Sequence, residues 1–317
     1  MSTPVDKLPP APPALLARRA RWRGWLSPLP LITGVFSAGV VAMLVIILWN
    51  IVAGGIGRLT WEFLTAAPAQ GLRAGGIFPA IFGTLFLVIL MTIAVIPIGV
   101  ATAIFLRYYA RPDSFYARAV RVAVNNLAGV PSIVFGLFGL GFFIQFVGRG
   151  VDGLFFDNQL VFGQPAILWA SLTLALLTLP VVIVSTEEAM RAIPRDYLEA
   201  SYSLGATRWQ TISRVVIPNS LAGILTGGIL AVSRGAGEVA PIMFTGAAYF
   251  LPYLPSKLTD QFMELGYHVF VLSTQSPDVE GTLPILYSTV LVLLLLTFAL
   301  NALAVLIRSR LRGRQAV

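Results

Sequence analysis

The segment MRAIPRDYLEASYSLGATRWQTISRVVIP (190–218) is the longest patterned polar stretch in this chain, and long apolar runs flank it on both sides. Only 11% of the 317 residues are charged, 57% are hydrophobic, and the mean hydropathy is +0.83. A soluble domain carries about 25% charged residues, so this chain cannot cover a surface that faces water. The sequence therefore predicts an all-α integral membrane protein in which this segment connects two spans.

Local signals predict a first helix inside this connection. Pro194 suits the first helical position. A helix continued to Leu204 would place Tyr197, Ser201 and Leu204 on one face. Gly205 can end that helix, because glycine adopts positive φ without a steric penalty.

A second helix is predicted to follow at once. Thr207 and Gln210 have the spacing of a capping box, which satisfies backbone donors at a helix start. Trp209 and the apolar residues after it recur at helical spacing up to Pro218, where we expect this helix to end and the next span to begin. On spacing alone, an amphipathic loop lying on the bilayer surface would fit as well.

Six apolar runs are long enough to cross a bilayer, which takes about 20 residues. They are Leu31–Val52, Ile81–Leu106, Val130–Val147, Ile167–Val184, Leu221–Phe244 and Leu283–Ile307. We expect residues 1–30 to form a disordered basic cytoplasmic arm, residues 31–310 to form one six-span domain with a polar loop at 186–218, and residues 311–317 to form a cytoplasmic tail.

The distribution of basic residues predicts the orientation. Six spans place seventeen of the 22 lysines and arginines on the side of the two termini, four on the other side, and Arg234 within a span. Basic residues favour the cytoplasmic side, so both termini should be inside. The net charge of +8 then reports membrane orientation, and no nucleic-acid partner is expected.

The composition excludes several kinds of site. The chain has no cysteine and a single histidine, His268, which we place in an external loop with a structural role. Neither Lys7 nor Lys257 lies in a phosphate-binding P-loop. We therefore expect no metal site, no cofactor and no enzymatic activity in this chain.

Arg234 and Glu238 lie inside the fifth apolar run, four residues apart, so they should share a helix face and pair. Arg234 is about 13 residues, or roughly 20 Å, beyond Leu221 and past the bilayer midplane. A lone charge there costs about 2.5–3.5 kcal/mol. The pair could fix helix packing, or it could line a translocation pathway, where the planar fork of arginine suits an oxyanion.

Pro131 and Ser132 are a further candidate for the pathway. A proline inside a span frees a backbone carbonyl, and a serine hydroxyl can partly compensate for the lost hydrogen bond. A simple kink for helix packing is the alternative interpretation.

The polar loop resembles the signature of bacterial ABC importer permeases, Glu-Ala-Ala, three residues, Gly, nine residues, Ile-x-Leu-Pro. The matching residues here are Glu199, Ala200, Ser201, Gly205, Val215, Ile217 and Pro218. Ser, Val and Ile replace Ala, Ile and Leu of the signature. The resemblance implies that the helix carrying Glu199 docks on a cytoplasmic ATPase.

Three further stretches are similar to the PstA-type permease family of phosphate ABC importers, over roughly residues 75–307. They are Gly129–Gly139 with Pro-Ser-Ile-Val, Ser233–Pro241 with Arg-x-x-x-Glu-x-Ala-Pro, and a Tyr-His pair that ends at His268. The resemblance implies the MetI-like type I importer fold in the bacterial inner membrane.

The same resemblance implies the partners. They are a second, PstC-type permease, two PstB-type ATPase subunits that bind ATP and Mg²⁺, and an external PstS-type phosphate-binding protein. A permease for sulfate, molybdate or another oxyanion remains an alternative, as does a secondary anion transporter or channel. A membrane-embedded enzyme would need a nucleophile or metal constellation that the sequence lacks.

Overall fold

The computed structural model describes residues 28–72, 74–111, 114–276 and 278–313. The predicted arm lies mostly outside these residues, as does the end of the predicted tail. The chain divides into two compact units, 1–53 and 54–317. In the first unit, α2 (Pro28–Gly55) supplies the first apolar helix and runs into the second unit at its end.

Six helices of the described residues are long and apolar enough to span a membrane, as the sequence predicts. They are Pro30–Arg58, Phe78–Tyr109, Ser132–Phe155, Ile167–Arg191, Arg208–Gly235 and Val279–Arg310. Three spans differ clearly from the prediction. The third reaches Phe155 instead of Val147, and the fourth reaches Arg191 instead of Val184. The fifth starts at Arg208 and ends at Gly235 instead of running from Leu221 to Phe244.

Short elements connect α2 to the second span. They are η1 (Ile56–Arg58), α3 (Trp61–Thr65), β1 (Pro68–Ala69), η2 (Gln70–Leu72) and β2 (Ala74–Gly75). The two strands pair antiparallel, with Pro68 opposite Gly75. The second span then consists of α4 (Phe78–Ile104) and a widened turn, η3 (Phe105–Tyr109).

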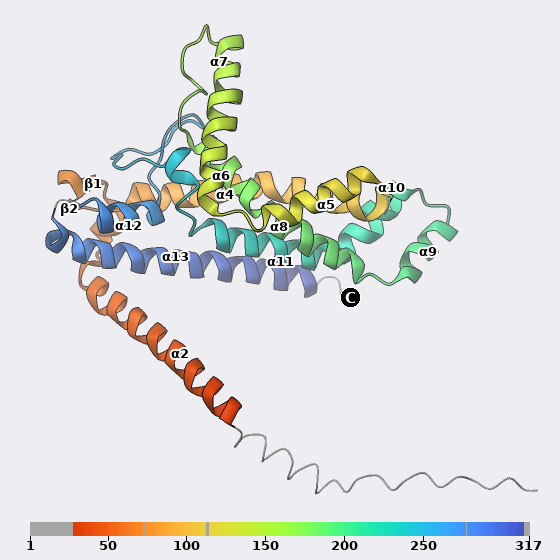
Figure 1. Cartoon of the computed structure of the whole chain (residues 1–317), viewed down its shortest axis with the longest axis horizontal. Helices are drawn as coiled ribbons and strands as arrows, with labels where there is room; N and C mark the ends of the chain where they lie inside the picture. The colour runs from red at the N-terminus through yellow and green to blue at the C-terminus, as the bar shows by residue number, and fades with distance from the viewer. Residues whose placement is uncertain (1–27, 73, 112–113, 277, 314–317) are drawn as a thin grey trace, which may run out of the picture. The chain divides into compact units, whose positions relative to one another are not determined.

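The helix α8 (Ile167–Arg191) is the centre of the second unit. It packs against both α4 and α11 (Ile217–Gly235), which also contact each other, and α11 also contacts α13 (Val279–Gly313). Figure 1 shows α4, α8, α11 and α13 running alongside one another. Their shared core contains Met91, Leu174 and Ala231.

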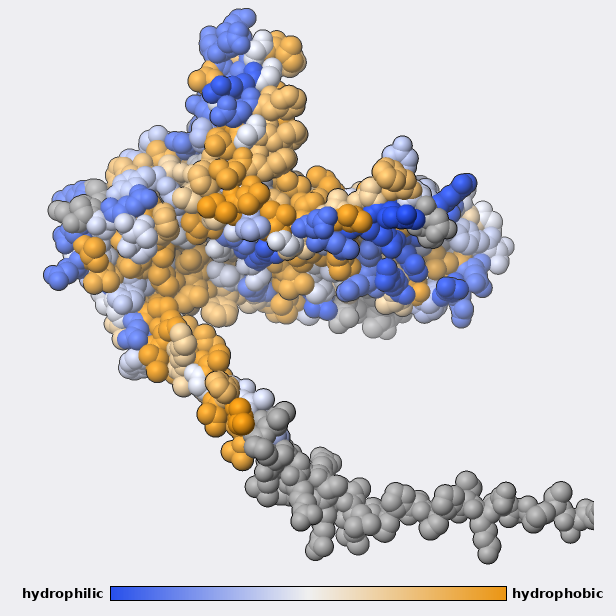
Figure 2. Space-filling view, viewed as in Figure 1, coloured by the Kyte–Doolittle hydropathy of each residue, from blue (hydrophilic) through white to orange (hydrophobic). Residues whose placement is uncertain are grey.

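The third span points away across these four helices (Figure 1). It is built from α6 (Ser132–Phe138), the wide-turned η4 (Gly139–Gly148) and α7 (Arg149–Phe155). An amphipathic helix, α5 (Phe115–Leu127), precedes it. The space-filling view shows apolar side chains along the third span with polar ones at its outer end, and a concentration of polar ones over α5, α9 and α10 (Figure 2).

The remaining elements belong to the polar loop and to the segment before α13. The loop contains α9 (Arg195–Ser203), α10 (Arg208–Thr211) and the widened turn η5 (Ile212–Val216). After α11 come η6 (Ile242–Phe244) and a short apolar helix, α12 (Leu265–Thr274).

Candidate functional site

The helix α11 ends partway through the bundle, and this break carries the predicted pathway residues. A Cβ at Gly235 would overlap Met91, which lies near the middle of the second span. The chain then turns: the Gly237 N–H donates to Arg234 O at 3.3 Å and the Glu238 N–H donates to Gly235 O at 3.4 Å. Non-helical backbone at this depth occurs in membrane proteins where it is buried in protein or lines a cavity.

Arg234 and Glu238 form the expected pair, with Arg234 Nε 3.2 Å from Glu238 Oε1. The prediction that they share a helix face is wrong, because only Arg234 is helical and Glu238 lies in the turn beyond the helix end. Arg234 is in the last turn, where a cation complements the helix dipole. Its side chain is 41% exposed and that of Glu238 20%. Since the bond uses Nε, the terminal nitrogens of Arg234 remain able to donate to an anion.

Asn301 holds the last span against this break and was not predicted from the sequence. Its Nδ2 donates to Ser233 Oγ at 3.2 Å, directly beside Arg234. The available signal was a single amide residue inside the largely apolar run Leu283–Ile307. Polar side chains within membrane segments commonly face the bundle interior.

The structure corrects the placement of Pro131 and brings its segment to the break. Pro131 is not inside a span; it immediately precedes α6, which begins at Ser132. Pro131 is exposed and Ser132 half-buried. Four residues further on, a Cβ at Gly136 would lie 2.9 Å from Ala240 O and 3.1 Å from Pro241 Cα. The segment that follows Pro131 and the segment that follows Glu238 therefore pack with their backbones in close contact.

The hairpin formed by α9 and α10, hereafter the polar hairpin (residues 186–218), matches its local signals. Gly205 has φ +79° and ends α9. Thr207 and Gln210 form the reciprocal capping box that opens α10. Pro194 immediately precedes α9 instead of being its first residue.

Only part of α9 packs on the bundle. Leu198 contacts the cluster around Met190 and Ile212, and Ser201 Oγ lies 2.9 Å from Thr211 Oγ1. Tyr197 and Leu204, which were expected on the same face as Ser201, are 53% and 89% exposed. The hairpin is thus held by few contacts and leaves apolar side chains in the open.

Pro218 does not end the second helix, contrary to the prediction. The widened turn shifts the backbone register, and the Ile217 N–H donates to Ile212 O. Such a turn of five-residue spacing lets a helix continue where the regular pattern fails. One helix therefore runs from Arg208 to Gly235 and links the hairpin directly to Arg234.

The other motif residues of the hairpin are accessible to different degrees. Glu199, Ala200 and Pro218 are exposed, whereas Val215 and Ile217 are half-buried.

His268 is not in a loop; it lies in α12 and is 3% exposed. Burial lowers its pKa to about 4. One turn earlier, Glu264 accepts the N–H groups of Gly266 and Tyr267 at 2.8 and 2.6 Å and so caps α12. Burial raises the pKa of Glu264 to about 7. Glu264 thus caps the helix between the last two spans, whereas the buried Nδ1 of His268 has no hydrogen-bond partner among the described residues, so a structural role for His268 stays a prediction.

Known proteins with similar sequences identify the family of this chain. The family model described as binding-protein-dependent transport system inner membrane component matches residues 95–313. The probable ABC transporter permease protein YqgI of Bacillus subtilis is 32% identical over 79% of this chain and 86% of its own length. The phosphate transport system permease protein PstA of Yersinia pestis is 32% identical over 82% of each chain.

Solved structures share the fold. A bacterial alginate ABC transporter aligns with 89% of this chain and 95% of its own, with a TM-score of 0.65 at 14% identity. The MetNI methionine ABC transporter aligns with 73% of this chain and 94% of its own, with a TM-score of 0.54 at 20% identity. The predicted type I importer fold is confirmed, and the chain belongs to the binding-protein-dependent transport system inner membrane components, as a multi-pass permease subunit of an ABC transporter.

Proposed function

We propose that this chain forms half of the translocation pathway of an ATP-driven phosphate importer. The observation that carries the proposal is Arg234, a half-exposed arginine at a helix break deep in the bundle. It occurs in a chain 32% identical to a phosphate transport permease over 82% of the length. An arginine fork is suited to a phosphate oxyanion.

The pair itself is neutral, so it cannot by itself hold an anion with a full charge. A second permease of the PstC type supplies further donors on the opposite wall of the pathway. An external PstS-type protein delivers phosphate to the pair of permeases. Glu238 keeps Arg234 oriented and gives up part of the contact when the anion arrives.

The polar hairpin faces the cytoplasm, with both termini on that side, and docks on an ATPase of the PstB type. The exposed residues Tyr197, Glu199 and Leu204 offer the contact surface. ATP and Mg²⁺ are bound by that partner. Movement of the hairpin is passed along the helix from Arg208 to Gly235, about 42 Å for 28 residues, and changes access to Arg234.

Phosphate uptake by Arg234→Gln tests the pathway role. We expect uptake to fall at least about tenfold, because an amide lacks the charge and the fork. Arg149→Gln, on the exposed start of α7, is the matched control and should transport normally. Undiminished uptake by Arg234→Gln at normal expression would contradict the pathway role.

The docking role has its own test in Glu199→Arg. Because Glu199 is exposed on α9, the variant should fold and insert normally but lose coupled transport. Co-purification of an intact, active ATPase complex with this variant would contradict the docking role of Glu199.

A further inference from the structure

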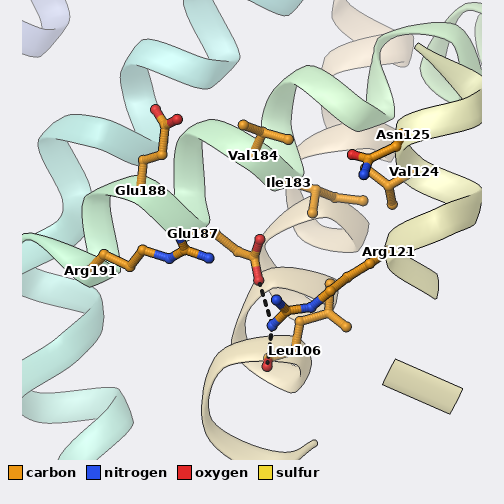
Figure 3. Close-up of a pocket in the computed structure, with 9 residues that line it drawn as sticks. All are labelled: Leu106, Arg121, Val124, Asn125, Ile183, Val184, Glu187, Glu188 and Arg191. Atoms are coloured by element: carbon orange, nitrogen blue, oxygen red, sulfur yellow. Dashed lines mark hydrogen bonds and ion pairs between the residues drawn. The ribbon is translucent and has the colours of Figure 1, made fainter. Parts of the chain in front are cut away.

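A pocket of about 240 Å³ lies beside the end of α8, outside the site at Arg234 (Figure 3). The side chains of Leu106 and Ile183 give it an apolar wall, and Arg121, Glu187 and Arg191 give it charge. Arg191 is the last residue of α8, and α9 begins four residues later. The pocket is therefore at the hairpin end of the bundle.

The charged groups converge on Glu187. Arg121 Nη2 lies 3.8 Å from Glu187 Oε1 and donates to Leu106 O at 3.5 Å. Figure 3 shows Arg191 on the same pocket without an ion pair to Glu187, whereas Glu188 points away from that carboxylate. Among the described residues, the buried Glu187 Oε1 has no hydrogen-bond partner, since 3.8 Å is too long for one. A buried acceptor of this kind is costly unless a donor reaches it.

This arrangement repeats that of Arg234 and Glu238. In each pair the arginine is nearly half exposed, 41% for Arg234 and 45% for Arg121. In each pair the glutamate is more buried, 20% for Glu238 and 14% for Glu187. Both arginines thus present their charge while a carboxylate holds them from behind.

We propose that the pocket is a second binding site for inorganic phosphate, occupied by the anion after it has passed Arg234. The proposal rests on the proposed phosphate transport. The guanidinium groups of Arg121 and Arg191 would donate to the unprotonated oxygens, and Asn125 lines the same pocket. Glu187 would accept the hydrogen of a P–OH group. The four charged residues of the lining, Arg121, Arg191, Glu187 and Glu188, sum to zero formal charge. Glu188 points away from the other three (Figure 3), and a monoanion would balance the charge of those three, so the pocket suits the singly charged form.

The carboxylate also gives the site its selectivity. Sulfate near neutral pH carries no proton, so it would place an oxygen acceptor against Glu187 and leave both groups unpaired. Sites built to pair a ligand hydrogen reject analogues that lack it. A phosphodiester lipid headgroup shares the phosphate chemistry but likewise lacks a P–OH group, so inorganic phosphate fits the pocket better.

Equilibrium binding of radiolabelled inorganic phosphate to the purified importer complex, in nanodiscs of neutral lipid, tests the site. The double variant Arg121→Gln/Arg191→Gln should lose one bound phosphate per copy of this chain. Arg234→Gln should retain that phosphate even though its uptake is impaired. Loss of uptake in Arg234→Gln and loss of this phosphate are separate results, so the two proposals can fail separately.

Glu187→Gln separates a ligand role from a structural one. We expect wild-type sulfate competition to be at least about tenfold weaker than phosphate competition, and this preference should disappear in Glu187→Gln. If the pair only fixes α5 on α8, the double variant will lower the melting temperature and leave the bound phosphate unchanged, which overturns the proposal. Retention of an anionic lipid in native mass spectra, with no phosphate bound at this pocket, would assign it to a headgroup and also overturn it.

Discussion

The helix from Arg208 to Gly235 is held in opposite ways at its two ends. At the Arg208 end the contacts are mainly polar: the exposed capping box, the partly buried Ser201–Thr211 hydrogen bond, and the Arg208 guanidinium 5.4 Å from the centre of the Tyr109 ring. At the Gly235 end, glycines of the helix pack so closely against side chains of neighbouring helices that no methyl group would fit.

The difference bears on how the helix can move. Individual exposed polar contacts contribute about 0.5–1.5 kcal/mol each, so a partner can rearrange the hairpin at modest cost. Closely packed interiors transmit displacement instead of absorbing it. A shift applied at the hairpin should therefore reach Arg234 as a movement of the whole helix.

The largest effect is expected from filling the close contact at the break. Gly136→Leu would drive a side chain into the backbone at Ala240 and Pro241, and overpacking typically costs about 1–3 kcal/mol or more. Uptake should be lost and the melting temperature of the complex in detergent lowered. Gly141→Leu, in the same span, should behave as wild type, because no atom lies within 4 Å of the position that a Cβ would take there. Equal behaviour of the two variants would show that the break is not tightly packed.

Burial on the break side also predicts a response to pH. The pKa of Glu264 is about 7 in the fold, raised by burial from 4.5. The folded state therefore binds the Glu264 proton more tightly, and the contribution of Glu264 to stability should fall as pH rises from about 4.5 through about 7. The pKa of His268 falls from 6.5 to about 4 on burial, so His268 contributes the opposite slope below about pH 6.5. Melting of the complex between pH 5 and pH 8 should therefore change little in wild type and in the exposed control Glu280→Gln, whereas stability should rise with pH in Glu264→Gln. The same pH profile in all three would contradict a pKa of Glu264 raised by burial.

The sequence was informative about the hairpin because its signals are local. Gly205 and the Thr207–Gln210 pair act within a few residues, so their pattern predicts both the stop and the restart. Gly235, where the helix breaks, packs against Met91, which is distant in the chain, and the apolar composition around Gly235 does not signal a break. Pro218 does not end the helix, because the widened turn before it accommodates a residue that has no backbone N–H to donate.

A smaller effect is expected at the turn of the hairpin. Gly205 has φ +79° and open space around it, so a substitution there tests backbone conformation alone. Gly205→Val should cost about 1–2 kcal/mol, since residues with a Cβ disfavour this region. Amide exchange in α9 should speed up roughly tenfold for about 1.4 kcal/mol, while exchange around Gly235 stays unchanged. Gly205→Asn, which tolerates positive φ better, is the control, and acceleration at both ends of the helix would contradict the local origin.

The smallest effect concerns the serine that replaces the second alanine of the signature. Ser201 Oγ lies 2.9 Å from Thr211 Oγ1, so it joins α9 to the helix that leads to Arg234. Single variants Ser201→Ala and Thr211→Val, with their combination, form a double-mutant cycle. We expect a coupling free energy of about 0.5–1.5 kcal/mol for the hydrogen bond, measured as hairpin stability by amide exchange. Additive effects would mean that the apolar contact of Leu198 alone holds α9. Coupling would mean that this hydrogen bond holds the hairpin end of the helix, whereas close packing of glycines holds the Gly235 end.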